Sequence, residues 1–423
     1  MRLWLIPMIY VGASAACGLT LPRYEHGYLA SYTFDLSVAS AQAYLSAVAS
    51  GMMALTGVVF ALAFVMVQFS AVAYSPRLVL WFARDRTLFH SLGAFAATFI
   101  YALFTLAWID RGGSGNVPLF SSVLVGIMLI FSMFLFSRLV QRLTDLQITS
   151  VLRLIGDKGR GVIREMFQRL DERPAAESNP GSGLASGTQV GPASQTLVYS
   201  GYPRTIASLN AGALARQAQE SGAVIVMACA VGDTLLDGSV VLRVHGAKDS
   251  LAERNLMRAI HLKSERTFEQ DPKYPIRLLV DIAIKALSPA INDPTTAVQA
   301  IDQIEDLLRR LARRDLDAGF ARDSNGVLRV IVPMPTWEDY LTLAFDEIRQ
   351  FGMGSIQVMR RLRAALTGLT ETAMVASRAD AVRHYLKHLD LVIDRSPLDA
   401  EDKATARPAD RQGLGLSRRG PDG

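Results

Sequence analysis

Long apolar runs dominate the first third of the chain and then give way to shorter, mixed segments. Four runs reach the roughly 20 apolar residues that a helix needs to cross a bilayer, and they cover residues 3–21, 45–73, 88–109 and 117–140. The second run lies in a stretch without charge between Asp35 and Arg77. At about 1.5 Å per residue its helix exceeds a ~30 Å hydrocarbon core, so it must tilt or project. Residues 1–145 are therefore predicted to form an α-helical integral membrane bundle of four spans.

Basic residues flank these runs unevenly, and Lys and Arg beside a span mark its cytoplasmic side. The two loops on one side hold only Arg23 and Arg111, whereas the other side is rich in positive charge: Arg2, then Arg77, Arg84 and Arg86, then Arg138, Arg142, Arg153, Lys158, Arg160 and Arg164. We expect the N-terminus and everything after residue 145 in the cytoplasm. A rival interpretation makes the first run a signal peptide cleaved near Ala15; it leaves three spans and the same orientation.

Small residues recur at four-residue spacing in these runs, which lets helix backbones approach closely. The rows are Ala43, Ala47 and Gly51; Ser46, Ser50 and Ala54; Gly57 and Ala61; Gly93 and Ala97; and Ser122 and Gly126. They favour either tight packing within one subunit or self-association into a homo-oligomer with a pore. The pore-lining candidates are Gly51, Thr56, Gly57, Gln68 and Ser70, although hydroxyls at this depth also bond their own helix backbone. No Asp, Glu, Lys, Arg or His lies well inside a run, which argues against a proton-coupled pump.

Polar segments frame the rest of the chain. Residues 146–173 keep a helical pattern with interspersed arginines and predict a juxtamembrane basic helix. Those charges either attract anionic lipid heads or only set the orientation. Residues 174–196 have the Gly, Ser and Pro content of a flexible linker, and residues 396–423 are predicted to be a disordered tail.

Two kinds of pattern share the region between the linker and the tail. Residues 197–247 read as short strands with glycines at the turns, and they predict a small β-rich module. It is similar to β-sandwich modules of the lipoyl type, without the lysine that carries the lipoyl group. Residues 248–395 are predicted to be mainly helical, with one strand in 326–333 and helices over 337–369 and 378–394. The expected fold class is thus a four-span bundle followed by a cytoplasmic α+β domain, mainly helical with a small β-rich module.

The segment DIAIKALSPAINDPTTAVQAID, residues 281–302, places a charged pair in an apolar helix and then a proline-bounded corner. Pro289 should end the first helix near Leu287. Asp293 and Pro294 suit the N-cap and the first position of a second helix. That helix has an apolar face at three- and four-residue spacing, and two ion pairs are expected on its solvent face, Glu305 with Arg309 and Asp306 with Arg310.

Two interpretations of this corner stay open. In the first it is a structural lock, in which Asp281 and Lys285 pair with each other or with the corner, because a buried charge needs a partner. In the second, the free amides at the start of the second helix bind an anionic cytoplasmic metabolite. The candidate ligand-binding residues are Arg266, Asp281, Lys285, Ser288, Asn292, Asp293, Thr295 and Thr296.

Other chemistry is weakly marked. Residues 264–275 crowd four charges together and favour a salt-bridged helix end; alternatively Glu269, Asp271, Asp281 and Asp293 could serve acid–base catalysis in a hydrolase. His384 and His388 have a zinc-compatible spacing but no third ligand, so we predict no metal. The chain has no phosphate loop, dinucleotide motif or nucleophile elbow, which predicts no cofactor. The net charge of +5 over 423 residues is modest, and no nucleic-acid partner is expected.

Several segments together resemble a known family. They are GMMALTGVVFALAFVMVQFSAVAYSPRL with FARDRTLFHSLGAFAATFIYALFTL, then SGY, ERTFEQDP, LVDIAIKALSPAINDPTTAVQAID and LAFDEIRQFG, and they cover roughly residues 45–369. The chain resembles the bacterial predicted membrane proteins grouped as domain of unknown function 2254. That resemblance implies four spans followed by a cytoplasmic domain, and no activity or catalytic residues. Where the family tends to have histidines, at the end of the fourth span, this chain has LFSRLVQRL.

Three functional hypotheses follow. The first is a non-enzymatic, homo-oligomeric protein of the bacterial inner membrane, channel-like and gated or assembled by its cytoplasmic domain, whose partners are the lipid bilayer and further copies of itself. The second is a membrane-anchored sensor or scaffold for an anionic metabolite. The third is a membrane-bound hydrolase.

Overall fold

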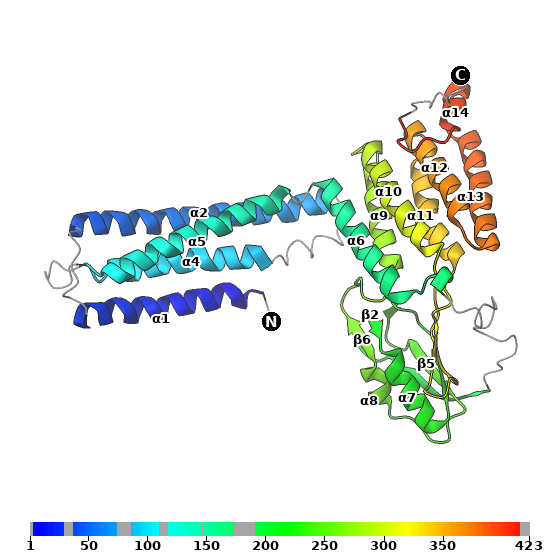
Figure 1. Cartoon of the computed structure of the whole chain (residues 1–423), viewed down its shortest axis with the longest axis horizontal. Coiled ribbons are helices and arrows are strands. Elements are labelled where there is room, and N and C mark those ends of the chain that lie inside the picture. Colours follow the sequence, from blue (N-terminus) through cyan, green and yellow to red (C-terminus); the bar gives the residue numbers. More distant parts are fainter. Residues whose placement is uncertain are drawn as a thin grey trace. The chain divides into compact units, whose positions relative to one another are not determined.

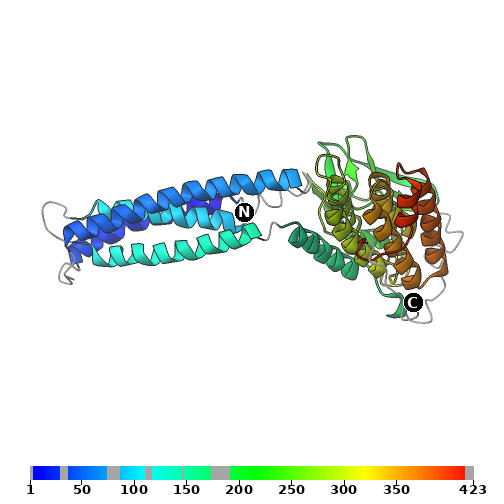
Figure 2. The ribbon, with the colours of Figure 1, turned by 90° about the horizontal axis from the view of Figure 1, so that it is seen from above.

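The computed structural model describes residues 3–28, 37–73, 86–109, 117–144, 147–172 and 191–414. The chain divides into two compact units, Met1–Ser150 and Val151–Gly423. The first contains the long helices α1 (Leu5–Tyr28), α2 (Val38–Ala73), α4 (Arg86–Leu106) and α5 (Leu119–Thr144). Within the described residues these four are long and apolar enough to cross a membrane, which confirms the predicted runs. They lie side by side along their length (Figures 1 and 2).

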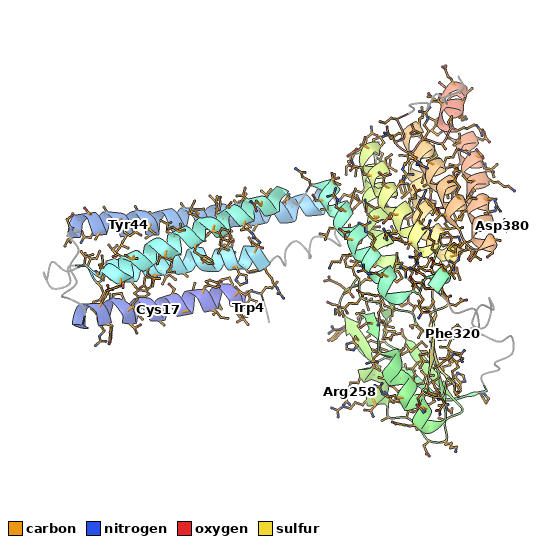
Figure 3. All side chains as sticks on the ribbon, in the orientation of Figure 1. Trp4, Cys17, Tyr44, Arg258, Phe320 and Asp380 are labelled. Carbon is orange, nitrogen blue, oxygen red and sulfur yellow. The ribbon has the colours of Figure 1, made fainter. Side chains whose placement is uncertain are left out.

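Helix α4 is the centre of this bundle and contacts the other three helices. Its Phe95 and Tyr101 are buried in a common core with Leu45 and Met52 of α2 and Leu139 of α5. Figure 3 labels Trp4 just before α1, Cys17 on α1 and Tyr44 on α2.

Helix α1 packs on α4 as an integral part of the bundle. A Cβ atom at Gly93 would lie 3.0 Å from the ring of Tyr10, and one at Gly18 would lie 2.8 Å from Phe104 Cβ. These two glycines therefore set the close approach of the helices, as expected for small residues in such packing. The first run thus behaves as a helix of the bundle, and its removal as a signal peptide would expose this surface of α4.

The second unit contains most of α6 (Ile148–Met166). Its longer C-terminal part is helical except for two short strands between the second and third of these helices: α9 (Lys273–Ala286), α10 (Pro294–Leu311), α11 (Trp337–Phe351), α12 (Ile356–Thr372), α13 (Ala376–Arg395) and α14 (Ala400–Ala406). The apolar face of α6 is buried. At Gly159 a Cβ atom would meet Leu307 of α10 at 2.8 Å, and Arg160 pairs with Asp306 at 2.7 Å. The helix expected along a membrane surface therefore has its apolar face on α10, and one of its arginines turned inward.

Two small sheets form the β-rich part. Their strands are β1 (Ala193–Val198), β2 (Arg204–Leu209), β3 (Val224–Met227), β4 (Thr234–Leu235), β5 (Val240–His245), β6 (Ile260–Lys263), β7 (Phe320–Arg322) and β8 (Leu328–Ile331). One sheet has the order β1-β5-β3-β8-β7 and the other β4-β2-β6. Only the β3–β8 pairing is parallel among the described strands.

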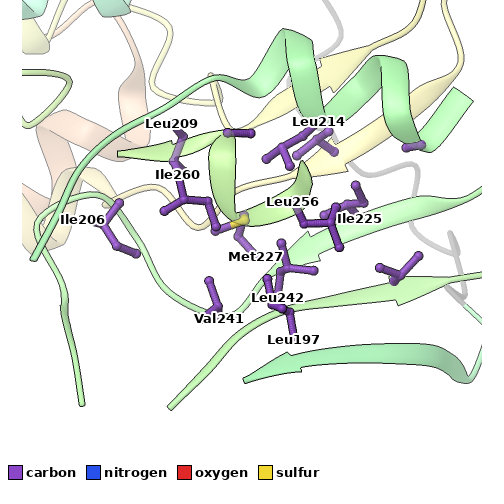
Figure 4. Close-up of a cluster of buried hydrophobic side chains, with 14 of the residues drawn as sticks. Leu197, Ile206, Leu209, Leu214, Ile225, Met227, Val241, Leu242, Leu256 and Ile260 are labelled. Carbon is purple, nitrogen blue, oxygen red and sulfur yellow. The ribbon is translucent and has the colours of Figure 1, made fainter. Parts of the chain in front are cut away.

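A single apolar core joins these sheets to α7 (Ala211–Ser221) and α8 (Glu253–Arg258). Leu214 of α7 and Leu256 of α8 pack with Ile225, Leu242 and other strand residues in this cluster (Figure 4). Because helices supply part of the core, the module is an open α/β arrangement, and the expected likeness to a lipoyl-type β-sandwich is wrong.

Four expected boundaries need correction. Strand β1 starts at Ala193, inside the expected linker 174–196, while residues 173–190 lie outside the described residues. The β-rich module extends beyond 197–247, because β6, β7 and β8 come from the region 248–395 that was expected to be mainly helical. The helix expected over 337–369 is interrupted by a turn at Gly352 to Ser355. The expected disordered tail 396–423 contains α14, which Asp399 caps through Asp402 N at 2.8 Å.

Candidate functional site

The corner between α9 and α10 is held by its own hydrogen bonds. The Asp293 amide donates to Ala286 O at 2.8 Å, and the Asn292 amide donates to Ser288 O at 2.9 Å. Ser288 Oγ donates to Lys285 O at 2.6 Å. Asn292 has a φ of +48°, a left-handed conformation that asparagine tolerates better than most residues. The proline-bounded corner is thus a compact turn between two helices.

Asp293 occupies the N-terminus of α10 with its own carboxylate. Its Oδ1 accepts from Thr296 N at 3.0 Å and its Oδ2 from Thr296 Oγ1 at 2.6 Å, while Pro294 takes the first helical turn as predicted. An internal anion therefore sits where an anionic ligand would bind. Thr295 and Asn292 are exposed, so these residues line no enclosed site.

The charged pair within α9 has partners that the spacing did not reveal. Asp281 accepts from Arg277 at 2.5 Å, and Arg277 also pairs with Glu347 of α11 at 2.7 Å. The contact joins α9 to α11 and accounts for the half-buried carboxylate. Lys285 lies one turn further along, and burial lowers its pKa below the ordinary value. The arrangement favours the structural lock, with Arg277 as a basic partner of Asp281 that had not been expected.

Arg266 belongs to the opposite end of α9. It forms an ion pair with Asp271 and lies over the ring of Tyr274 at 5.5 Å. Asp271 is 2% exposed and also accepts from the amides of Lys273 and Tyr274 at 3.1 and 3.2 Å. Since α9 rises about 18 Å between residues 273 and 285, Arg266 cannot reach the corner. Its assignment to the same ligand site is wrong.

The carboxylates of the hydrolase hypothesis are likewise separated. Glu269 pairs with Lys263 at 2.6 Å, and Asp271, Asp281 and Asp293 have the partners described above. Ten residues of chain along α9 place Asp271 and Asp281 roughly 15 Å apart, beyond the ~9.5 Å of cooperating carboxylates. The geometry gives this hypothesis no site.

The two histidines of α13 also have structural surroundings. His388 Nε2 lies 2.9 Å from Arg349 Nη1, which connects α13 to α11, and His384 is exposed. Among the described residues, no group of three or more His, Cys, Asp and Glu side chains is placed to hold a metal ion.

A charge cluster between α10 and α12 was not foreseen from the sequence. Arg361, whose side chain is 5% exposed, donates to Asp302 at 2.7 Å and to Glu305 at 2.5 Å. Glu305 also pairs with Arg309 at 2.7 Å, and Gly368 of α12 makes room for these groups. The expected Glu305–Arg309 pair exists, but Glu305 is buried at the helix interface and does not lie on the solvent face.

A cavity delimited by described residues lies in the first unit, between α2 and α4. It is an open groove of about 640 Å³. Five small residues of α2 line it together with larger side chains: Ser46, Ala49, Ser50, Ala54 and Gly57, with Met53 of α2 and Phe99, Leu103 and Leu106 of α4. The row Ser46, Ser50 and Ala54 had been recognised by its spacing; the α4 side of the groove had not.

The five pore-lining candidates divide among different faces of α2. Gly57 lines the groove, and a Cβ atom there would meet nothing within 4 Å. Gly51 is equally open but points elsewhere, and Thr56 donates its hydroxyl to Met52 O at 2.8 Å. Gln68 is exposed, and the side chain of Ser70 lies outside the described residues. The candidates therefore do not form one lining.

The groove face of α2 and the outer face of α5 differ in kind. The exposed face of α5 is built from large apolar side chains, among them Phe120, Val123, Ile127, Ile130 and Phe134. Such a surface suits lipid chains, whereas small residues and hydroxyls are enriched where membrane helices meet. The α2 groove is of the second kind.

Four long apolar helices followed by a separate α+β unit are the features of a multi-pass membrane protein. The chain belongs to the family of predicted membrane proteins DUF2254, whose model matches residues 1–368. The resemblance drawn from the motifs is therefore confirmed. An uncharacterised protein of Mycobacterium tuberculosis and one of Mycobacterium bovis are each 26% identical to the chain over 415 residues, covering 95% of this chain and 78% of the relative. No solved structure matches the chain.

Proposed function

We propose that this chain is a non-enzymatic, channel-like protein of the bacterial plasma membrane, which assembles into homo-oligomers through the groove between α2 and α4. The second unit then lies in the cytoplasm with the N-terminus, as the basic flanks favour. The observation that carries the proposal is the groove itself, an open surface that includes Ser46, Ser50, Ala54 and Gly57 and contrasts with the large apolar outer face of α5.

The face of α2 supports contact between copies. At about 100° per residue, Ser46, Ser50, Gly57 and Gln68 fall within about 40° of one another, and all four are exposed. The hydroxyls of Ser46 and Ser50 have no hydrogen-bond partner within the described residues, unlike that of Thr56, which bonds its own helix. A second copy would supply polar partners and close packing, which lipid chains cannot do.

The remaining hypotheses lose their support from the geometry. The corner expected to bind an anionic metabolite is capped by Asp293, and the hydrolase carboxylates each have a separate basic or backbone partner. In contrast, the uncharged polar face of α2 is compatible with a path that forms between copies.

Cysteine cross-linking in native membranes tests the assembly. In a background without Cys17 and Cys229, we expect Ser50→Cys to give oxidant-dependent oligomers. The control is Ile130→Cys on the outer face of α5, which is 72% exposed and should stay monomeric. Equal cross-linking at both positions, or none at Ser50, would refute the assembly through the groove.

A filled groove tests function in liposomes that contain the purified full-length chain. Gly57→Leu places a side chain in the groove and should abolish both the Ser50→Cys cross-links and potassium flux. Gly12→Leu is the matched control, because Gly12 is an exposed glycine of α1 with open space around it. Flux that survives Gly57→Leu, or is lost equally in Gly12→Leu, contradicts the proposal.

A further inference from the structure

Helix α4 carries a buried polar face. Ser91, Thr98 and Thr105 recur every seven residues, which places them on one side of the helix, and each is at most 1% exposed. Tyr101, also 1% exposed, lies between the last two. This face points into the bundle and away from the groove, whose α4 residues are Phe99, Leu103 and Leu106.

Hydroxyls of the neighbouring helices meet this face. Ser132 of α5 lies 3.1 Å from Thr98 Oγ1, and Ser14 of α1 donates to Ala97 O at 2.5 Å. Both are buried. The interior of the bundle thus contains a line of hydroxyl groups contributed by three helices.

One hydroxyl in this line has no partner. Thr98 and Thr105 bond the carbonyls of Ala94 and Tyr101, as structural hydroxyls in membrane helices usually do. Within the described residues, however, Ser91 Oγ is buried without a hydrogen bond. A buried polar atom without a protein partner usually bonds an ordered water. Simple helix packing does not account for this group.

A buried carboxylate lies at one end of the line. The sequence placed the end of the first span before Glu25, but α1 continues to Tyr28 and Glu25 is only 7% exposed. Its carboxylate accepts from the amides of Phe120 and Ser121, the latter at 3.1 Å, and from Ser121 Oγ at 2.6 Å. Ser121 and Glu25 are close neighbours of the Tyr101 hydroxyl. The Tyr101 hydroxyl is therefore separated from an ionisable side chain only by Ser121.

The other end of the line also has an ionisable side chain. Helices α1 and α4 run parallel, because their contacts advance together along both helices: Tyr10 with His90, Ser14 with Ala97, and Gly18 with Phe104. His90 Nδ1 lies 3.2 Å from Tyr10 Oη, and His90 directly precedes Ser91, whose hydroxyl has no partner within the described residues. The line thus connects Glu25, where α1 ends, to His90, near where α1 begins.

We propose that the interior of the bundle conducts protons along the polar face of α4, between Glu25 and His90. The inference goes beyond the proposed assembly through the groove, because this path lies inside one bundle and carries protons. A proton from water binds the Glu25 carboxylate. Each hydroxyl group or water molecule along the line then accepts one proton on its oxygen and releases the proton it held before. At the far end, a ring nitrogen of His90 delivers a proton to water. Only O–H and N–H bonds form and break. The longest interval, Ser91 to Thr98, rises about 10 Å and requires about three water molecules at hydrogen-bond spacing.

Proton flux into liposomes tests the path. The full-length chain is reconstituted in phosphatidylethanolamine and phosphatidylglycerol vesicles with an internal pH dye, and a potassium gradient with valinomycin drives protons. We expect Thr98→Val and Glu25→Gln to lower the initial rate about tenfold or more, as the loss of one hydrogen-bonded relay group implies. Thr20→Val is the control, because its hydroxyl bonds Ala16 O on an exposed face of α1.

The outcomes separate this inference from the proposed function. The Ser50→Cys cross-links report assembly in each variant, so a loss of proton flux with cross-links retained supports the path. Potassium flux and cross-links without proton flux, or equal rates for Thr98→Val and Thr20→Val, overturn the path and leave the proposed function standing. Proton flux in a protein that gives no cross-links supports the path and refutes assembly through the groove.

Discussion

Arg361 offers a sharp test of the charge cluster between α10 and α12. Arg361→Met keeps most of the volume of the side chain and removes both of its hydrogen bonds, to Asp302 and Glu305. Breaking a buried pair costs about 3–5 kcal/mol because one charge is left without its partner. Here Glu305 keeps Arg309, and Asp302 is half-exposed, so we expect the lower end, about 3 kcal/mol.

Hydrogen exchange of the full-length chain measures this loss locally. About 3 kcal/mol corresponds to roughly a hundredfold faster exchange of the buried amides of α10 and α12. The matched control is Arg310→Met, whose pair with Asp306 is exposed and should contribute less than about 1 kcal/mol. If Arg361→Met changes the exchange as little as Arg310→Met, the cluster does not hold these helices together. The double variant Arg361→Met with Glu305→Leu should recover most of the protection, because apolar replacement of both partners is close to neutral.

Three further predictions concern the second unit. Asp293→Ala should lower the free energy of unfolding by about 1 kcal/mol through loss of the cap, seen as a lower melting temperature, whereas Asp293→Asn should retain most of it; equal losses in both would contradict the capping role. Burial, and to a lesser extent Arg349, lower the pKa of His388. The neutral form of His388 therefore contributes fully to stability above about pH 6.5, and this contribution falls as the pH drops towards the lowered pKa. His388→Gln should make the melting temperature less dependent on pH between about pH 7 and 5. Gly232→Val, at a φ of +93° and with a Cβ atom 2.5 Å from Asp271 Oδ2, should destabilise the start of α9, whereas Gly246→Val, also at positive φ but with open space, should show backbone strain alone in the same exchange experiment.

The local features of this chain were predictable because they depend on neighbours in sequence. The length of each apolar run is sufficient to identify a membrane-length helix, and Pro289, Asp293 and Pro294 define a helix end and a helix start by their own backbone chemistry. The corner therefore lies where the sequence placed it, with Asp293 as the cap.

Ion-pair partners on different helices were not predictable, because the spacing of residues along one helix does not show which other helix packs against it. Asp281 and Lys285 have the separation of an ion pair, but this spacing did not indicate Arg277, one turn earlier, which pairs with Asp281 and with Glu347 of α11. Glu305 was expected in solvent because nothing local indicates Arg361, 56 residues later. Likewise, Glu25 follows the first apolar run and was expected in a loop. It lies instead within α1, which continues to Tyr28, and its carboxylate contacts α5.

The parallel pairing of β3 with β8 has a consequence for how the second unit is made. Ile225 of β3 is paired with Val330 of β8. The sheet β1-β5-β3-β8-β7 therefore stays incomplete until more than a hundred residues after Ile225 have left the ribosome. The α9–α10 hairpin lies within that interval. Contacts of such long range slow folding, and any chain truncated between β3 and β8 would present β3 as an unpaired edge, which is a template for aggregation.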